Sequence, residues 1–129
     1  SAVTFITGHE AGGGPPEGLD WPALASGAPV LILYMALKHL AWMAERLIGA
    51  GLDPDTAVVL ISKATTEDQQ IVETHLSAAA ADAAAAGIEA PAIVAIGDVV
   101  ELRAALDPSA TPEARARAVQ EVRRKRDAG

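Results

Sequence analysis

Three stretches of almost uninterrupted apolar residues stand out along the chain, and each predicts a buried strand. Residues 30–35 read VLILYM, residues 56–62 read TAVVLIS, and residues 93–96 read IVAI. A half-exposed strand would alternate polar and apolar positions, whereas these runs are apolar at nearly every position. The pattern therefore predicts a sheet whose central strands are covered on both faces.

The first of these strands leads directly into a helix. Apolar side chains recur there at the spacing of one helix face, at Leu37, Leu40, Ala41, Ala44, Leu47 and Ile48. This spacing predicts a helix over residues 36–50 that packs back on the sheet, with Gly51 placed to end it.

A strand, a helix and a second strand in one compact stretch favour a right-handed crossover between parallel strands. The carboxyl ends of strands 30–35 and 56–62 should then meet at one edge of the sheet. Tyr34, Met35 and the 63–65 turn would lie there. Open α/β sheets usually bind ligands in the crevice beyond these strand ends.

Shorter elements are predicted around this unit. They are a β-prone run at residues 1–7, a Gly- and Pro-rich loop at 8–18, a short helix at 19–25 with Asp20 as its N-cap, and a helix over 99–106 capped by Asp98. The loop lacks the spacing of a phosphate-binding P-loop, which favours a surface connection.

Residues 65–87 allow two interpretations. Thr66 and Gln69 form a capping box before an alanine run, which favours one helix over residues 66–86,. Residues 70–74 could equally form a short strand, with the helix beginning near Leu76. Local sequence does not separate these two possibilities.

Together the pattern predicts an α/β fold with a mixed, largely parallel sheet of about five strands and three or four packed helices. Residues 1–107 would form this domain. Residues 108–129 contain helix formers but few large apolar residues, so they predict a basic tail that is helical or disordered,.

Composition narrows the possible functions. The chain has 129 residues, of which 50% are hydrophobic, and no cysteine, so it can bury a core but not form a disulfide,. No apolar run reaches the length of about 18 residues that spans a bilayer, and the first residues lack the pattern of a secretion signal. We therefore expect a cytoplasmic protein without membrane association.

Charge is distributed unevenly along the chain. The net charge is −7, but residues 1–107 carry four Lys or Arg against fourteen Asp or Glu, while residues 108–129 carry six against three. An acidic body does not attract nucleic acid, and the basic tail is short and lacks aromatic residues. We expect no nucleic-acid partner.

Candidate chemical groups are few. His9 follows a predicted strand end, His39 is expected to be solvated and His75 partly buried. Their spacing matches no metal-binding motif, so no metal site is predicted. Asp98 and Glu101 fit a helix cap and a solvated helix face. No nucleophile or pair of catalytic carboxylates can be identified.

Two apolar residues have alternative interpretations. Met35 could fill the core at the end of its strand, or its adaptable thioether could contact a flat heterocycle. Trp42, with its neighbour Met43, could pack in the core or widen the apolar face of the helix into a subunit contact.

Five stretches in register resemble the second domain of the uroporphyrinogen-III C-methyltransferases, within the tetrapyrrole methylase family. They read TFITGHE, EGLDWPALA, PVLILYMALKHLAWMAERLIGAGL, VVLISKATTEDQQIVETHL and APAIVAIGDVVELRAAL. The resemblance covers nearly all of residues 3–106. It also implies that residues 70–74 form a strand rather than part of a helix.

The resemblance implies an S-adenosylmethionine-dependent enzyme that methylates uroporphyrinogen III at C2 and C7 to give precorrin-2, on the route to sirohaem and cobalamin, with S-adenosylhomocysteine as the other product. It implies a homodimer in which the cofactor lies between two α/β domains. The cofactor-binding positions that it implies are Tyr34, Met35, Ile61, Ala64, Pro91, Ala92 and Ile93. Apolar walls and backbone groups at these positions suit an adenine and a ribose.

The chain also departs from the family pattern. The first domain, with its Gly-rich loop, is absent, Ala36 stands where glycine is usual, and Gln70 replaces an arginine. We therefore expect the chain alone to bind cofactor weakly and to be inactive. Two alternatives are a domain of another precorrin C-methyltransferase and a non-catalytic dimerisation module.

Overall fold

A computed structural model describes residues 3–8, 14–27, 29–62 and 69–106, and every structural statement below refers to these residues. Its elements in chain order are β1 (Val3–Thr7), α1 (Trp21–Gly27), β2 (Val30–Tyr34), α2 (Leu40–Gly49), β3 (Ala57–Ser62), β4 (Gln70–His75), α3 (Ala79–Ala85), β5 (Ala92–Gly97) and α4 (Val99–Leu106). Short 3-10 turns, Leu37–His39 and Leu76–Ala78, precede α2 and α3. The predicted tail at 108–129 lies outside the described residues.

The five strands form one sheet in the order β1-β2-β5-β3-β4. β1 pairs with β2 in parallel, whereas β5 is antiparallel to both β2 and β3, and β4 is antiparallel to β3. β2 and β3 therefore run in the same direction, as predicted. They are not neighbours, however, because β5 lies between them.

The predicted mixed α/β sheet of about five strands is confirmed, but parallel pairing is limited to β1 and β2. The prediction that the sheet is largely parallel is wrong, because β2 and β5, β5 and β3, and β3 and β4 pair antiparallel. A strand that is apolar on both faces suits any central position, parallel or antiparallel, so its side-chain pattern does not reveal its direction. Five of the six residues of β5, all except Ile93, are buried, as expected of a strand at the centre of the sheet.

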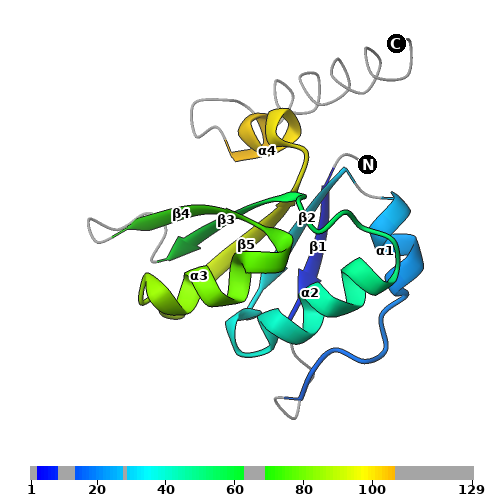
Figure 1. Ribbon diagram of the computed structural model, residues 1–129, viewed down its shortest axis with the longest axis horizontal. Coiled ribbons are helices and arrows are strands. Elements are labelled where there is room, and N and C mark those ends of the chain that lie inside the picture. The colour runs from blue at the N-terminus through cyan, green and yellow to red at the C-terminus, as the bar shows by residue number, and fades with distance from the viewer. Residues whose placement is uncertain (1–2, 9–13, 28, 63–68, 107–129) are drawn as a thin grey trace.

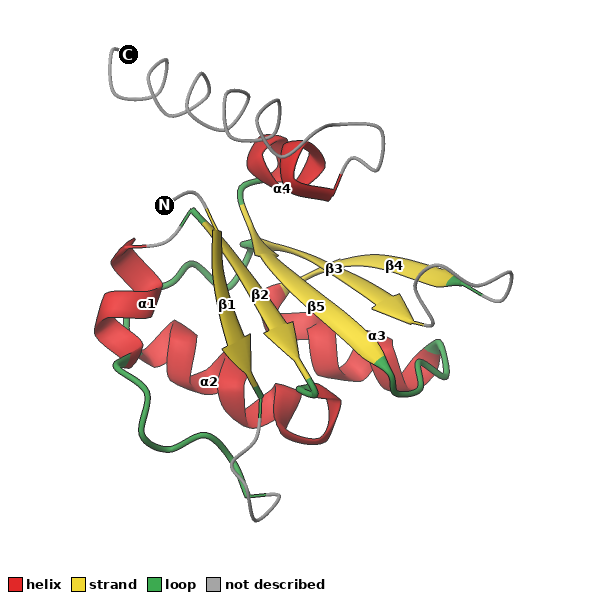
Figure 2. Cartoon of the chain, turned by 180° about the vertical axis from the view of Figure 1, so that it is seen from behind, coloured by secondary structure: helices red, strands yellow, loops and turns green. Residues whose placement is uncertain are grey.

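Helices cover the two faces of the sheet unequally. α1, α2 and α3 lie against one face, while α4 lies at one end of the other (Figure 1). Seen from behind, the strands stand in front of the three helices and α4 sits beyond their ends (Figure 2). The main core lies between the sheet and α2 and α3, and a smaller cluster joins Leu102 of α4 to Val30, Ile32 and Ala95. Among the described residues, α4 is thus the one helix on the second sheet face, and it covers only one end of that face.

Several local predictions are confirmed. Asp20 caps α1, since its Oδ1 accepts a hydrogen bond from the Ala23 amide at 3.1 Å,. Gly51 follows α2 with a φ of 113°, as a glycine that ends a helix should,. The predicted helix over 36–50 is shorter, because a 3-10 turn occupies Leu37–His39 before α2 begins.

Residues 70–75 form strand β4, so the interpretation as one continuous helix is wrong there. The side chains of β4 are held by contacts distant in sequence: the Gln70 amide group donates to the Ala86 carbonyl at 2.9 Å, and the Thr74 hydroxyl donates to Asp82 of α3. Pairing with β3 and these two contacts outweigh the helix propensity of the segment,.

Candidate functional site

The strand register brings three predicted cofactor-binding residues into one row. Tyr34 of β2 lies opposite Ile93 of β5, and Ile93 lies opposite Ile61 of β3. Directly paired residues project to the same side of a sheet. Ile93 packs with the smaller cluster under α4, so the row lies on the face away from α1, α2 and α3. The insertion of β5 thus supplies the middle residue of the row.

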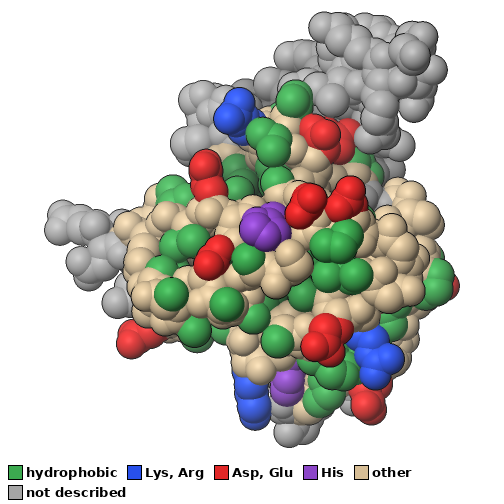
Figure 3. Space-filling view, viewed as in Figure 1, with side chains coloured by type: hydrophobic (Ala, Val, Ile, Leu, Met, Phe, Trp, Pro, Cys, Tyr) green, Lys and Arg blue, Asp and Glu red, His purple; other side chains and the backbone are tan. Residues whose placement is uncertain are grey.

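The row continues to both edges of the sheet. Thr7 of β1 pairs with Tyr34, and Ile71 of β4 pairs with Ile61. Tyr34 is 40% exposed and Ile71 55% exposed, and the Tyr34 ring stacks on the ring of Phe5 with centroids 5.8 Å apart. The row is therefore an open, largely apolar strip on this face, which also carries the exposed Glu73 and His75 of β4. On the helix side, charged side chains are scattered among apolar ones (Figure 3).

Met35 directly follows Tyr34, just beyond the carboxyl end of β2. Its side chain is 61% exposed, so the interpretation as core filler is wrong. Its φ is 55°, in the left-handed region that residues other than glycine seldom adopt,. Such conformations are concentrated at ligand-binding and active sites. An exposed methionine held in this way fits a ligand contact better than a structural role.

Of the remaining predicted positions, the structure places only some where a ligand in the row could reach them. Pro91 is exposed and directly precedes β5, at the same edge as the end of β2. Ala92 pairs with Ser62 and is buried, so its side chain points to the face opposite that of Ile93,. It could reach a ligand only through its backbone. Ala64 and His9 lie outside the described residues.

The chemistry of this edge is that of a binding surface. Among the described residues, the row of Thr7, Tyr34, Ile93, Ile61 and Ile71 carries no ionisable group other than the tyrosine hydroxyl, and backbone amides and carbonyls lie at the strand ends. Such a surface can hold a flat, largely apolar ring and orient it. Among the described residues, no group of three or more His, Asp or Glu side chains could hold a metal ion.

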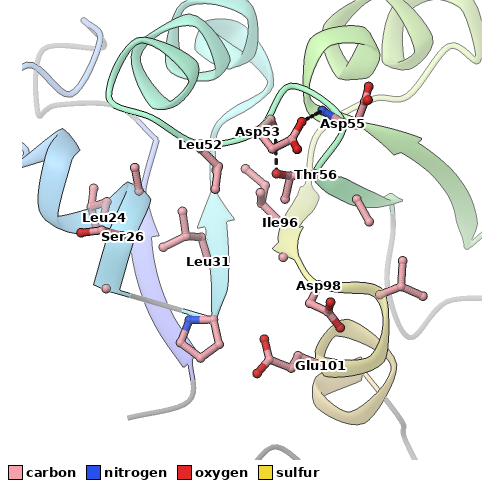
Figure 4. Close-up of a pocket in the computed structure, with 16 residues that line it drawn as sticks. Leu24, Ser26, Leu31, Leu52, Asp53, Asp55, Thr56, Ile96, Asp98 and Glu101 are labelled. Carbon is pink, nitrogen blue, oxygen red and sulfur yellow. Dashed lines mark hydrogen bonds between the residues drawn. The ribbon is translucent and has the colours of Figure 1, made fainter. Parts of the chain in front are cut away.

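A cavity of about 530 Å³ lies at the opposite end of the sheet and was not predicted (Figure 4). Asp53, Asp98 and Glu101 line it, with Leu31 of β2 among its apolar residues. Asp53 accepts the Asp55 amide at 2.8 Å, and Asp98 accepts the Val100 amide at 2.9 Å, so both carboxylates stabilise local turns. Leu31 precedes Tyr34 by three strand residues, on the order of 10 Å. The cavity is therefore separate from the row.

Three further expectations changed. Glu101 is buried rather than solvated, on the side of α4 near the cavity. His75 is exposed rather than partly buried, and His39 is half-buried. No signal in the local sequence indicated these environments, because they depend on how α4 and β4 pack.

Trp42 and Met43 also differ from each other. Met43 is fully buried in the main core. Trp42 is half-buried, meets Trp21 edge-on with ring centroids 5.6 Å apart, and lies under the Arg46 guanidinium at 4.9 Å. Contacts within the chain therefore occupy much of the Trp42 ring.

No helix among the described residues is long and apolar enough to cross a membrane.

Comparisons with known proteins identify the family of the chain. A sequence profile of the Tetrapyrrole (Corrin/Porphyrin) Methylases matches residues 1–80. The uroporphyrinogen-III C-methyltransferase of Sinorhizobium sp. is 50% identical over 106 residues, which cover 82% of this chain and 38% of that protein. The S-adenosyl-L-methionine-dependent uroporphyrinogen III methyltransferase of Methanosarcina barkeri is 41% identical over 102 residues, covering 79% of this chain and 40% of that protein.

Solved structures show the same relationship. The uroporphyrin-III C-methyltransferase of Thermus thermophilus, complexed with S-adenosylhomocysteine, superposes with a TM-score of 0.61 at 26% identity, covering 78% of this chain and 43% of that one. A cobalt precorrin-4 methyltransferase superposes with a TM-score of 0.63 at 27% identity, covering 74% and 39%. The chain thus spans about two fifths of the length of these relatives. It belongs to the tetrapyrrole (corrin/porphyrin) methylase family.

Proposed function

We propose that this chain forms the cofactor-facing second domain of an S-adenosylmethionine-dependent methyltransferase that converts uroporphyrinogen III to precorrin-2 in the cytoplasm. Family membership and the two relatives named as uroporphyrinogen III methyltransferases support the reaction. The Thermus thermophilus relative, complexed with S-adenosylhomocysteine, supports the cofactor.

The observation that carries the proposal is the row of Tyr34, Ile93 and Ile61, with Met35 directly after Tyr34. Its apolar side chains, exposed at Tyr34 and half-buried at Ile93 and Ile61, and the strand-end backbone groups fit a nucleoside, which needs a flat wall and a few hydrogen bonds more than it needs charges,. Pro91 and the backbone of Ala92 would extend this wall, and Ala64 would complete it from the turn after β3.

The residues of the row need only orient and shield the reactants. S-adenosylmethionine supplies an electrophilic methyl group on a sulfonium, which a carbon nucleophile can take without an acid or a base acting on the leaving group. Tyr34 and Met35 would fix the position of the nucleoside end and exclude water from it. The absence of an acid–base pair from the described strand ends fits this chemistry.

The rest of the enzyme would complete the site. The relatives are about twice as long as this chain, and we propose that their additional domain supplies the second wall of the cofactor site. With a net charge of −7, this chain is poorly suited to hold a polycarboxylate alone,. Cationic substrate contacts would come from the other domain or from a second subunit of a homodimer. The isolated chain should therefore bind cofactor weakly and not catalyse methylation.

Cofactor binding can be tested with S-adenosylhomocysteine and the isotopically labelled chain. Titration should shift the backbone amide NMR signals of Tyr34, Met35 and Ile93. Signals at the opposite cavity, such as those of Asp53 and Val99, serve as the internal control and should not move. Saturable shifts confined to the cavity, or no shift at millimolar ligand, would contradict the proposed site.

A second candidate is methylation of a later precorrin. The similarity to cobalt precorrin-4 methyltransferase, at 27% identity and a TM-score of 0.63, supports it. Full-length protein should be assayed with uroporphyrinogen III and with later precorrins. Turnover of a later precorrin alone would replace the first candidate by the second. Sedimentation of the same protein tests the proposed homodimer, which a monomer mass would refute.

A further inference from the structure

The strained residue Met35 lies between two anchored neighbours. Among the described residues, it is the one residue other than glycine with a positive φ. Its side chain is mostly exposed, so burial in the core does not compensate for this conformation,. Something else in the structure must hold the backbone of Met35 in the left-handed region.

The residue before Met35 is anchored by a hydrogen bond. The amide of Gly8, directly after β1, donates to the carbonyl oxygen of Tyr34 at 2.6 Å. This bond continues the pairing of β1 with β2 by one residue. The end of β2 is thereby fixed to the end of β1.

The residue after Met35 is anchored by close packing. A Cβ atom on Gly8 would lie 2.4 Å from the Cα atom of Ala36 and 2.5 Å from its Cβ atom. Ala36 is fully buried. Only a glycine at position 8 allows Ala36 to come this near, and the chain must turn sharply at Met35 to bring it there.

We propose that Gly8 is a positioning residue for cofactor binding, which holds Met35 in its left-handed conformation by bonding to Tyr34 and packing against Ala36. This inference rests on the proposed cofactor site. In this proposal Gly8 acts only through its contacts with Tyr34 and Ala36 and does not touch the cofactor itself. Its effect is to present the Met35 side chain beside Tyr34, at the edge of the sheet where β2 ends.

The test compares Gly8→Ala with Gly14→Ala. Gly14 is a matched control because it lies in the same loop region and a Cβ atom there would meet nothing within 4 Å. NMR chemical shifts and couplings that report φ at Met35, and the affinity for S-adenosylhomocysteine, are measured for both variants. Gly8→Ala should move Met35 out of the left-handed region and weaken binding at least tenfold, while Gly14→Ala changes neither.

The outcomes separate this inference from the proposed function. If the unmodified chain binds the ligand and Gly8→Ala retains both the φ of Met35 and the affinity, the positioning role is refuted and the cofactor site stands. If the unmodified chain shows no binding, the proposed site fails and the positioning role fails with it.

A second pair of variants is available if Gly8→Ala does not fold. Met35→Gly and Met35→Ala both remove the thioether, but only glycine adopts a positive φ without strain. If Gly8 and Ala36 impose the conformation, Met35→Gly unfolds at a higher urea concentration than Met35→Ala. Equal midpoints would refute the positioning role.

Discussion

At the residue scale, side chains that hold the fold are distinct from those that face the candidate site. The two methionines show the difference. Met43 is 0% exposed and packs in the core between the sheet and α2, whereas Met35 is 61% exposed at the end of β2. The same residue type therefore contributes to stability at one position and is available to a ligand at the other.

We predict that alanine lowers stability at Met43 and weakens cofactor binding at Met35. Met43→Ala should lower the free energy of unfolding by about 2 to 5 kcal/mol, because it leaves a cavity in the core. Met35→Ala should change it by less than about 0.5 kcal/mol, because few contacts are lost. Urea unfolding measures both values, and S-adenosylhomocysteine titration should show weaker binding for Met35→Ala only. A loss of more than 2 kcal/mol at Met35 would identify it as a structural residue.

At the element scale, β4 and α3 depend on each other. The hydroxyl of Thr74 on β4 donates to the carboxylate of Asp82 on α3, and both groups are partly buried. Gln70 adds a second link from β4 to the end of α3. These contacts join the two segments that the local sequence would merge into a single helix.

A double-mutant cycle tests this link. Thr74→Val and Asp82→Ala should each destabilise the chain, and the double variant by less than their sum, with a coupling energy of about 1 to 3 kcal/mol for a hydrogen bond to a charged group. Ser77→Ala is a suitable control, since Ser77 is exposed and its amide bonds to the Pro54 carbonyl through the backbone. Additive effects would show that β4 and α3 are not coupled through this pair.

The two faces of β4 should also respond differently to the same change. Ile71→Thr alters an exposed side chain on the face away from α1, α2 and α3 and should change the unfolding free energy by less than about 0.5 kcal/mol while raising solubility,. Val72→Thr places a hydroxyl on the helix-covered face and should cost about 1 to 3 kcal/mol,. Urea unfolding and the protein concentration at which aggregation begins provide the comparison. Equal losses of unfolding free energy for the two variants would contradict a strand with one exposed face and one face covered by helices.

These elements show which features the sequence could reveal. Asp20 as a cap and Gly51 as a helix end were predictable because each depends on its immediate neighbours. The insertion of β5 between β2 and β3 was not, because strand order depends on contacts distant in sequence. The burial of Glu101 depends likewise on where α4 packs.

The candidate site was predictable in part for the same reason. Tyr34 and Met35 could be placed at a strand end from the apolar pattern alone, and the family resemblance added Ile61 and Ile93. Their alignment in one row needed the register of β5, and the strain at Met35 needed its backbone conformation. The contact between Gly8 and Ala36 joins two segments that are far apart in the sequence.

At the scale of the whole molecule, the apolar row and the acidic charge fit the proposed role as one domain of a methyltransferase. The chain spans 38% of its Sinorhizobium relative. It presents an apolar row that a bound cofactor and a second domain would cover,. Activity should therefore depend on combining this chain with a second domain such as the remainder of its relatives provides.

A chimera tests this dependence. The matching 106-residue segment of the Sinorhizobium enzyme is replaced by this chain, which is 50% identical over that segment. The chimera should methylate uroporphyrinogen III, detected by mass spectrometry as added methyl groups, because the two domains together enclose the cofactor, while the isolated chain should not. Met35→Ala in the chimera should lower kcat/KM at least tenfold, whereas Asp55→Ala, at the opposite cavity, should leave it unchanged,. A chimera that folds and binds S-adenosylhomocysteine but methylates no tetrapyrrole would show that this chain has lost the substrate contacts of its relatives. Equal reductions of kcat/KM in Met35→Ala and Asp55→Ala would show that Met35 has no special place in the site.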